Sequence, residues 1–289
     1  MSATQKDIRR RILAITKSSS YLKAFEDPVF LKSEQLRPIR LQLELLKPEM
    51  ILEKEGVAAT VVVFGSARIC DRVQVLKMIE RLKRLTRRRP HDRDLALRQR
   101  SLQALLKKTL YYEAARRFAA LVSRHYASHG ITIVTGGGPG IMEAANRGAW
   151  EAGAKSVGLN ITLPFEQESN SYISPELCFQ FHYFAVRKMH FLMRAKALVA
   201  FPGGYGTMDE LFEALTLIQT GKIERFPVIL FGSKYWKRVI DFSFLVEEGV
   251  IAPKDIELFS FADTAEEAFN IVQLWIDRGL LDGGHKIKN

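Results

Sequence analysis

The sequence contains little cysteine and no long uncharged apolar segment. Its 289 residues include two cysteines, Cys70 and Cys178, which are far apart and form no CxxC pair. Two such residues make neither a disulfide framework nor a zinc ribbon, and they fit a reducing compartment. No segment approaches the roughly 20 apolar residues of a membrane-spanning helix, which argues against an integral membrane protein. We therefore expect a cytoplasmic globular protein.

The start of the chain, MSATQKDIRRRILAITKSSS, lacks the apolar core and small-residue cleavage site of a secretory signal. Its arginines and serines are loosely similar to a transit peptide, but an amphipathic first helix is the simpler interpretation. A composition of 47% hydrophobic and 26% charged residues supplies a sizeable core, which excludes a wholly disordered chain.

Acidic residues are scarce in one segment, residues 81–117, while the formal charge of the whole chain is +11. The basic residues there are Arg81, Lys83, Arg84, Arg87, Arg88, Arg89, Arg93, Arg98, Arg100, Lys107, Lys108, Arg116 and Arg117, against Asp92, Asp94 and Glu113. The rest of the chain is therefore nearly neutral. Leucines at helical spacing and the break at Pro90 predict a helical hairpin over about 76–88 and 93–128.

The remainder of the chain alternates between short apolar runs and amphipathic segments. Strands are expected at 60–64, 131–134, 156–161, 197–201, 227–231 and 256–261, and helices at 141–151, 184–194, from 207, at 234–247 and at 264–277. This alternation predicts an α/β fold, a doubly wound, Rossmann-like parallel sheet. Residues 1–55 form an N-terminal helical extension punctuated by Pro38 and Pro48, residues 56–280 form the main domain with a basic insertion at about 81–117, and residues 281–289 form a tail.

Glycine follows three of the expected strands, in the turns Gly65-Ser66, Gly136–Gly140 and Gly203–Gly206. In a parallel sheet these turns share one edge, and the helices that follow offer free N–H groups to an anion. Together they indicate a nucleotide-like ligand with at least one phosphate. Neither the dinucleotide G-x-G-x-x-G pattern nor a P-loop is present.

The segment Pro202-Gly-Gly-Tyr-Gly-Thr-Met-Asp-Glu210 is the most informative. We expect Thr207 to cap a helix whose preceding glycine amides point at an anion, with Glu210 near that pocket. The plain alternative is a capping box, in which Glu210 folds back onto the Thr207 amide.

Residues 202–210 match every fixed position of the motif PGGxGTxxE, and the sequence resembles the LONELY GUY (LOG) family at this segment. The family, formerly labelled lysine decarboxylases, also carries an Arg-Lys pair one helix upstream, here Arg187-Lys188. Its further glycine turns correspond to Gly136-Gly-Gly-Pro-Gly-Ile-Met142 and Gly65-Ser66. The resemblance covers about residues 57–280, and the chain offers no recognisable Schiff-base lysine motif for a decarboxylase.

The resemblance implies a hydrolase of the nucleosidase type, a phosphoribohydrolase that cleaves the N-glycosidic bond of a nucleoside 5′-monophosphate. The expected substrates are AMP and N6-modified AMP such as a cytokinin ribotide. Two departures from the family stand out. The basic insertion interrupts the first βα unit, which is compact in small members, and the turn Gly-Pro-Gly-Ile-Met-Glu143 resembles the branch that includes larger nucleosidases. Both favour a broader, AMP-like specificity.

Glu210 and Arg187 are the expected catalytic residues, because the motif glutamate and arginine are catalytic and essential in the family. The amides of Gly203, Gly204 and Gly206, with the Thr207 hydroxyl, are assigned to the 5′-phosphate. Lys188 is either a phosphate contact or a surface residue. The residues expected to line the ribose and base are Ser66, Gly137, Gly138 and Glu143, the last of which could equally be a first-turn helix acid.

Other assignments remain open. The aromatic residues at 179, 181, 183 and 184 could form a base-stacking wall or part of the core. His125 and His129 have the spacing of two zinc ligands on a helix, but no third ligand is evident, so neither a metal nor a cofactor is expected. The family resemblance implies at least a homodimer. The alternative function is a non-catalytic nucleotide-binding or nucleic-acid-associated protein that uses the basic insertion.

Overall fold

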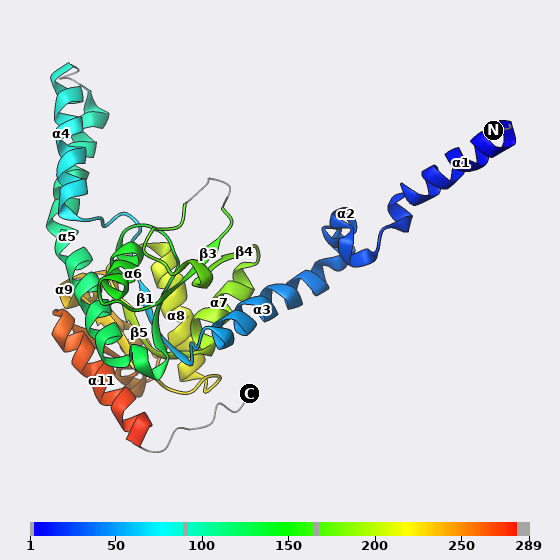
Figure 1. Ribbon diagram of the computed structural model, residues 1–289. Helices are drawn as coiled ribbons and strands as arrows, with labels where there is room; N and C mark the ends of the chain where they lie inside the picture. Colours follow the sequence, from blue (N-terminus) through cyan, green and yellow to red (C-terminus); the bar gives the residue numbers. More distant parts are fainter. Residues whose placement is uncertain (1–2, 89–91, 164–167, 282–289) are drawn as a thin grey trace. The chain divides into compact units, whose positions relative to one another are not determined.

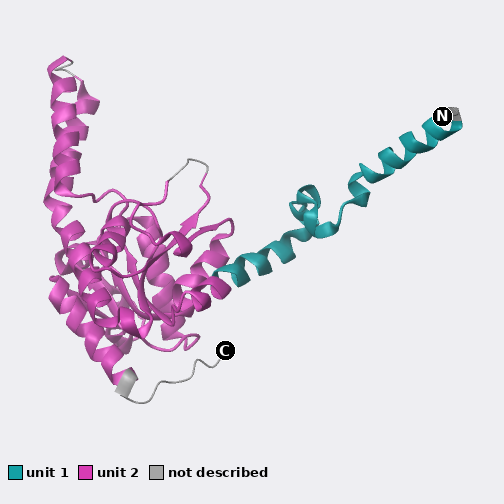
Figure 2. Ribbon diagram, in the orientation of Figure 1, with its two compact units in different colours: residues 1–48 teal, residues 49–289 magenta. Residues whose placement is uncertain are grey.

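The computed structural model describes residues 3–88, 92–163 and 168–281. The chain divides into two compact units, residues 1–48 and residues 49–289 (Figure 2). The predicted tail, residues 281–289, lies outside the described residues apart from its first position. None of the described helices combines the length and the hydrophobicity that a membrane crossing demands.

The larger unit is built on a parallel sheet of seven described strands in the order β4-β3-β2-β1-β5-β6-β7 (Figure 1). The strands are β1 (Ala59–Phe64), β2 (Ile131–Thr135), β3 (Ser156–Ile161), β4 (Cys178–Phe181), β5 (Ala195–Ala200), β6 (Val228–Phe231) and β7 (Phe259–Ala262). The order reverses between β1 and β5, so this doubly wound sheet has its ligand-binding crevice outside the carboxyl ends of those strands. The predicted fold class is confirmed.

Helices cover both faces of the sheet. Those of the larger unit are α4 (Arg72–Arg88), α5 (Arg93–Tyr126), α6 (Ile141–Glu151), α7 (Phe184–Met193), α8 (Tyr205–Gln219), α9 (Ser233–Val239), α10 (Phe242–Glu247) and α11 (Ala265–Leu281). The insertion is a helical hairpin made by α4 and the first half of α5, as predicted.

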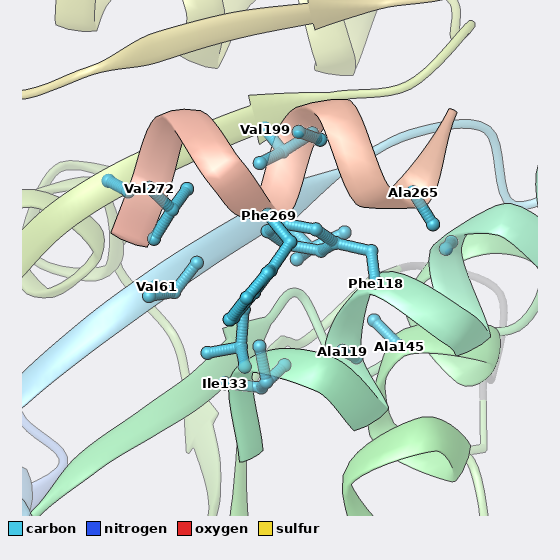
Figure 3. Close-up of a cluster of buried hydrophobic side chains, with 14 of the residues drawn as sticks. Val61, Phe118, Ala119, Ile133, Ala145, Val199, Ala265, Phe269 and Val272 are labelled. Atoms are coloured by element: carbon cyan, nitrogen blue, oxygen red, sulfur yellow. The ribbon is translucent and has the colours of Figure 1, made fainter. Parts of the chain in front are cut away.

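Successive side chains of a strand point to opposite faces of the sheet, and this alternation decides which part of the core each one enters. Val61 and Val63 of β1 join the cluster beneath α5, α6 and α11 (Figure 3). Phe64 points to the other face, where its ring lies 4.8 Å from that of Phe191 in α7. Because both faces are covered, every residue of β1 is buried, which explains its unbroken β-branched run.

The observed elements differ from the predicted ones in three places. The sequence did not predict the short edge strand β4, in which Phe179 and Phe181 are buried and their neighbours exposed. The segment predicted as a strand at 256–261 is a 3₁₀ helix (Pro253–Leu258) followed by β7. The helix predicted at 234–247 is two helices, because Asp241 accepts the amide of Phe244 at 3.0 Å and begins α10.

The smaller unit contains α1 (Ala3–Thr16), α2 (Pro28–Leu31) and most of α3 (Arg37–Lys54). Asp27 caps α2 by accepting the amides of Val29 and Phe30 at 2.9 and 3.0 Å. The prediction that Pro48 interrupts the helix is wrong, since α3 continues through it. Beyond Pro48, Glu49 pairs with Arg194 at 2.8 Å, a tertiary contact that holds the last turns of α3.

Candidate active site

The three glycine turns meet at the carboxyl edge of β1, β2 and β5. The Ser66 amide donates to the Pro202 carbonyl at 3.1 Å, and the Ile141 amide donates to the Ser66 carbonyl at the same distance. A Cβ on Gly65 would lie 2.6 Å from the Ile141 side chain, so only glycine allows this approach. The prediction that the turns share one edge is confirmed, and the edge coincides with the reversal of strand order.

Hydrogen bonds with Thr135 and Asn170 hold the turn after β2. The Gly137 amide donates to the Thr135 hydroxyl at 3.0 Å, and the Asn170 side chain donates to the carbonyls of Gly137 and Gly138 at 3.1 Å each. Gly137 and Gly138 are buried. The Gly137 amide and both carbonyls are therefore engaged within the turn.

Helix α8 begins two residues earlier than expected. Its N-cap is Gly204, whose carbonyl accepts the amides of Thr207 and Met208 at 3.0 and 3.1 Å. Thr207 is therefore the third helical residue, and the prediction that it caps the helix is wrong. Glu210 is the sixth helical residue, so the capping-box alternative fails as well. The helix starts where the Gly204 carbonyl takes up the first amides, and Gly203 leaves room for the Thr207 side chain that packs on it.

The start of α8 leaves backbone N–H groups open to a ligand. The amides of Gly203, Gly204 and Gly206 donate to no acceptor among the described residues. Gly204 and Gly206 are exposed and have open space where a side chain would stand. Gly203 instead packs on Thr207, whose Cβ would lie 2.6 Å from an added Cβ. Free amides at the positive end of a helix suit an anionic group.

Glu210 is a buried carboxyl with no hydrogen bond to any described residue, and its side chain belongs to a residue only 8% exposed. Burial raises its pKa to about 7, against the lowering effect of the nearby charges of Lys188 and Arg187. A carboxyl with this pKa exchanges protons near neutral pH, as acid–base catalysis requires.

Arg187 reaches from α7 across the edge of the sheet. Its Nε donates to the Leu159 carbonyl at 2.8 Å, and one terminal nitrogen would lie 2.7 Å from a Cβ on Gly136. Burial lowers the pKa of Arg187, while the Glu210 charge opposes that effect. The structure thus places a fixed guanidinium between the glycine turn of β2 and the carboxyl of α8.

Lys188 is paired with two carboxylates of α8. Its ammonium lies 2.9 Å from carboxylate oxygens of both Asp209 and Glu213 on α8. Burial lowers the pKa of Lys188, but these two hydrogen bonds outweigh it and raise the value to about 12. Lys188 therefore joins α7 to α8 on either side of Glu210, rather than standing free for a phosphate.

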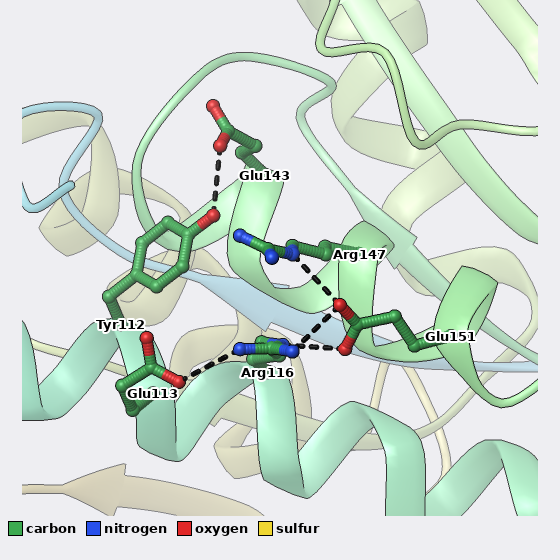
Figure 4. Close-up of polar contacts among 6 residues, drawn as sticks. All are labelled: Tyr112, Glu113, Arg116, Glu143, Arg147 and Glu151. Atoms are coloured by element: carbon green, nitrogen blue, oxygen red, sulfur yellow. Dashed lines mark hydrogen bonds and ion pairs between the residues drawn. The ribbon is translucent and has the colours of Figure 1, made fainter. Parts of the chain in front are cut away.

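Ser66 and Glu143 both form hydrogen bonds within the protein. The Ser66 hydroxyl accepts the Arg68 amide at 3.1 Å. Glu143, in the first turn of α6, accepts a 2.8 Å hydrogen bond from the Tyr112 hydroxyl of α5 (Figure 4). Arg116 of α5 lies at the same interface between α5 and α6. It pairs with Glu113 on its own helix and forms a 2.5 Å ion pair with Glu151 of α6.

Sequence reasoning missed two residues that support the site, Tyr112 and Asn170. Tyr112 is fully buried, and burial raises the pKa of its phenol, so it remains a hydrogen-bond donor to Glu143. Asn170 braces the β2 turn from a separate loop. Each forms hydrogen bonds with residues more than 30 positions away in the sequence. Neither belongs to a motif that residue spacing could reveal.

Packing decides most of the roles that the sequence left open for the aromatic residues and the histidines. Phe179 and Phe181 are core residues, whereas Phe184 is 51% exposed beside Arg187. The His125 ring packs against Phe269 at 4.7 Å. Among residues 3–88, 92–163 and 168–281, no cluster of three or more His, Cys, Asp or Glu side chains could hold a metal ion.

The family described as "Possible lysine decarboxylase" matches residues 142–272. Cytokinin riboside 5′-monophosphate phosphoribohydrolase LOG3 of Arabidopsis thaliana is 31% identical over 166 residues, which cover 56% of this chain and 74% of LOG3. The enzyme of the same name numbered LOG7, also from Arabidopsis thaliana, is 32% identical over 167 residues, 56% of this chain and 73% of LOG7.

Among solved structures, TM1055 aligns with a TM-score of 0.42 and 21% identity over 75% of this chain and 99% of that chain. The sequence relatives carry the family assignment, and the resemblance based on residues 202–210 is confirmed. With 31% identity across 74% of LOG3, the chain belongs to the LONELY GUY (LOG) family.

Proposed function

We propose that this protein is a phosphoribohydrolase that cleaves nucleoside 5′-monophosphates, with AMP or N6-modified AMP as substrate, into free base and ribose 5-phosphate. The observation that carries the proposal is the buried Glu210 carboxyl beside Arg187, at the edge where three glycine turns meet. The relatives named cytokinin riboside 5′-monophosphate phosphoribohydrolases support the same chemistry.

The 5′-phosphate is assigned to the N-terminus of α8, where the amides of Gly203, Gly204 and Gly206 are open and Thr207 supplies a hydroxyl. Binding the phosphate there positions the ribose over Glu210, two helical turns or less away. Ser66, Gly137, Gly138 and Glu143 are assigned to the ribose and base side, where the turns after β1 and β2 close the pocket.

Hydrolysis then proceeds through an oxocarbenium-like ribose. As the C1′–N bond breaks, its electron pair goes to the base, and ionised Glu210 stabilises the positive charge on the sugar. Glu210 also accepts a proton from the attacking water, whose oxygen bonds to C1′, and that proton finally resides on the base. Arg187 keeps its charge and orients Glu210 and the substrate, since a guanidinium is a poor acid.

The test is to incubate the full chain with a panel of nucleoside 5′-monophosphates and to measure free base and ribose 5-phosphate by chromatography. We expect AMP to be cleaved, and Glu210→Gln to lose about 10²–10⁴-fold in rate. Glu224→Gln, an exposed loop change, is the matched control. AMP that binds but is not cleaved would instead favour a non-catalytic nucleotide-binding protein.

We further propose that the enzyme is a homodimer in which α7 and α8 face a second copy. Phe184, Met189, Met193 and Tyr205 are 48–93% exposed on these two helices, next to Arg187 and Glu210. A shallow groove of about 500 Å³ continues this surface along α8. Light scattering should give twice the mass of one chain for the parent protein. The substitution Tyr205→Asp should reduce the measured mass to that of a single chain.

A further inference from the structure

The hairpin formed by α4 and residues 93–110 of α5 has a surface that hydrolysis does not use. Figure 1 shows it extending away from the sheet and the helices that cover it. Its basic residues are Arg72, Lys77, Arg81, Lys83, Arg84, Arg87, Arg88, Arg93, Arg98, Arg100, Lys107 and Lys108, against Glu80, Asp92 and Asp94 among the described positions. Asp92 is occupied as the N-cap of α5.

The apolar residues of α4 hold the hairpin together. Val75, Ile79 and Leu82 are buried at helical spacing, as is Leu95 on α5. Helix α5 therefore covers this buried stripe of α4. The apolar side chains of Val73, Leu76, Met78 and Leu85 are exposed beside the charged ones.

The outer face of α4 carries a row of cations. Lys77, Arg81, Arg84 and Arg88 recur at intervals of four, three and four residues, and all are exposed. At about 1.5 Å per residue the row is roughly 16 Å long. None of the four forms an ion pair with a described residue, whereas Lys83 pairs with Glu80 at 3.0 Å.

A second row lies on α5. Arg93, Arg100 and Lys107 recur every seven residues on the face opposite Leu95 and are exposed. Small and polar residues separate them, as in the shallow groove lined by Ala96, Gln99, Arg100, Gln103, Ala104 and Lys107. By contrast, Arg116 and Arg117, near the body, are paired with Glu151 and Glu266.

We propose that this hairpin is a docking surface for the sugar–phosphate backbone of duplex nucleic acid, bound without regard to sequence. Rows of unpaired cations on a helix neutralise regularly spaced phosphates and release their counterions. Residues 72–110 contain no Phe, Tyr or Trp. Because single-strand binding depends on aromatic side chains that stack on bases, the surface favours a duplex. The proposal is independent of the hydrolytic function.

The test measures anisotropy of a labelled duplex of about 20 base pairs, mixed in sequence, against the full chain at several salt concentrations. The variant K77Q/R81Q/R84Q/R88Q removes the row on α4. The control K222Q/K234Q/R238Q/K254Q removes the same charge from exposed positions on the body. Equal unfolding midpoints show that both variants fold as the parent does, and R93Q/R100Q/K107Q tests the second row separately.

Each phosphate contact contributes about 0.9 to the slope of log affinity against log salt, so four contacts contribute about 3.6. We expect the α4 variant to lose that part of the slope, which is about a 150-fold change in affinity between 50 and 200 mM salt. The body variant should bind like the parent. Equal losses in both variants would overturn the proposal, as would tighter binding of a single strand of the same length. Binding to phosphatidylserine vesicles without duplex binding would also overturn it, and would assign the surface to a membrane.

Discussion

Replacing Glu210 by glutamine separates the proposed catalytic role of this carboxyl from the free-energy cost of burying it. The pKa of the folded-state carboxyl is about 7, raised by burial from an ordinary value of 4.5. The native state therefore holds a proton that the unfolded chain releases between these two pH values. The contribution of Glu210 to stability is therefore greatest below pH 4.5, falls as the pH rises towards 7, and stays reduced above it.

The size of this effect follows from the difference between the two pKa values. A gap of about 2.5 pH units corresponds to about 3 kcal/mol at pH 8, and to about 1 kcal/mol or less at pH 5. Glutamine is neutral at both pH values and nearly the same size. Glu210→Gln should therefore raise the unfolding midpoint by roughly 6 °C at pH 8 and by little at pH 5, while hydrolysis of AMP is lost.

The assay is thermal unfolding of the parent, Glu210→Gln and the exposed control Glu224→Gln, each at pH 5 and pH 8. The control should follow the parent at both pH values, because Glu224 is solvated in the folded protein. A midpoint difference for Glu210→Gln that is the same at both pH values would refute the argument, since the carboxyl would then not be held neutral by burial.

Three further changes test the support around the site. Lys188→Met removes a cation that lowers the pKa of the catalytic carboxyl, so the rising limb of kcat/KM against pH should move to higher pH; an unchanged limb would contradict this. Gly203→Ala places a Cβ about 2.6 Å from that of Thr207 and should abolish measurable AMP binding in calorimetry. Tyr112→Phe removes the donor to Glu143 and should lower the unfolding free energy by about 1 kcal/mol in urea titrations, while Tyr21→Phe, an exposed change, should not.

The strands that sequence analysis located are those buried on both faces. Runs such as residues 61–63 are apolar throughout because helices cover both sides, and such runs are visible without an alignment. The edge strand β4 has one covered face, so its signal is an alternation over only four residues, Cys178-Phe-Gln-Phe181. That pattern is too short to distinguish an edge strand from a cluster of aromatic side chains.

The sequence predicted those candidate site residues that lie close together in the chain. It left undecided the role of residues whose partners are distant in the sequence. The turn at residues 202–206 implied open amides, and Glu210 follows it at a fixed distance on one helix. Whether Lys188 faced a phosphate or the surface could not be derived, because its partners Asp209 and Glu213 approach it only through the packing of α7 against α8. Spacing alone left both the cap and the catalytic interpretations of Glu210 open.

Helix α5 has two different environments along its length, and composition alone does not separate them. Its outer half contacts α4 and carries unpaired cations. Its inner half packs on α6, where Tyr112 and Phe118 are fully buried and Arg116 is neutralised by Glu151. The charge of the segment thus divides into a solvent-facing part that can meet a polyanion and an inner part, Arg116, that pairs with Glu151 at the end of α6. One continuous helix carries both parts and joins the hairpin to the domain built on the sheet.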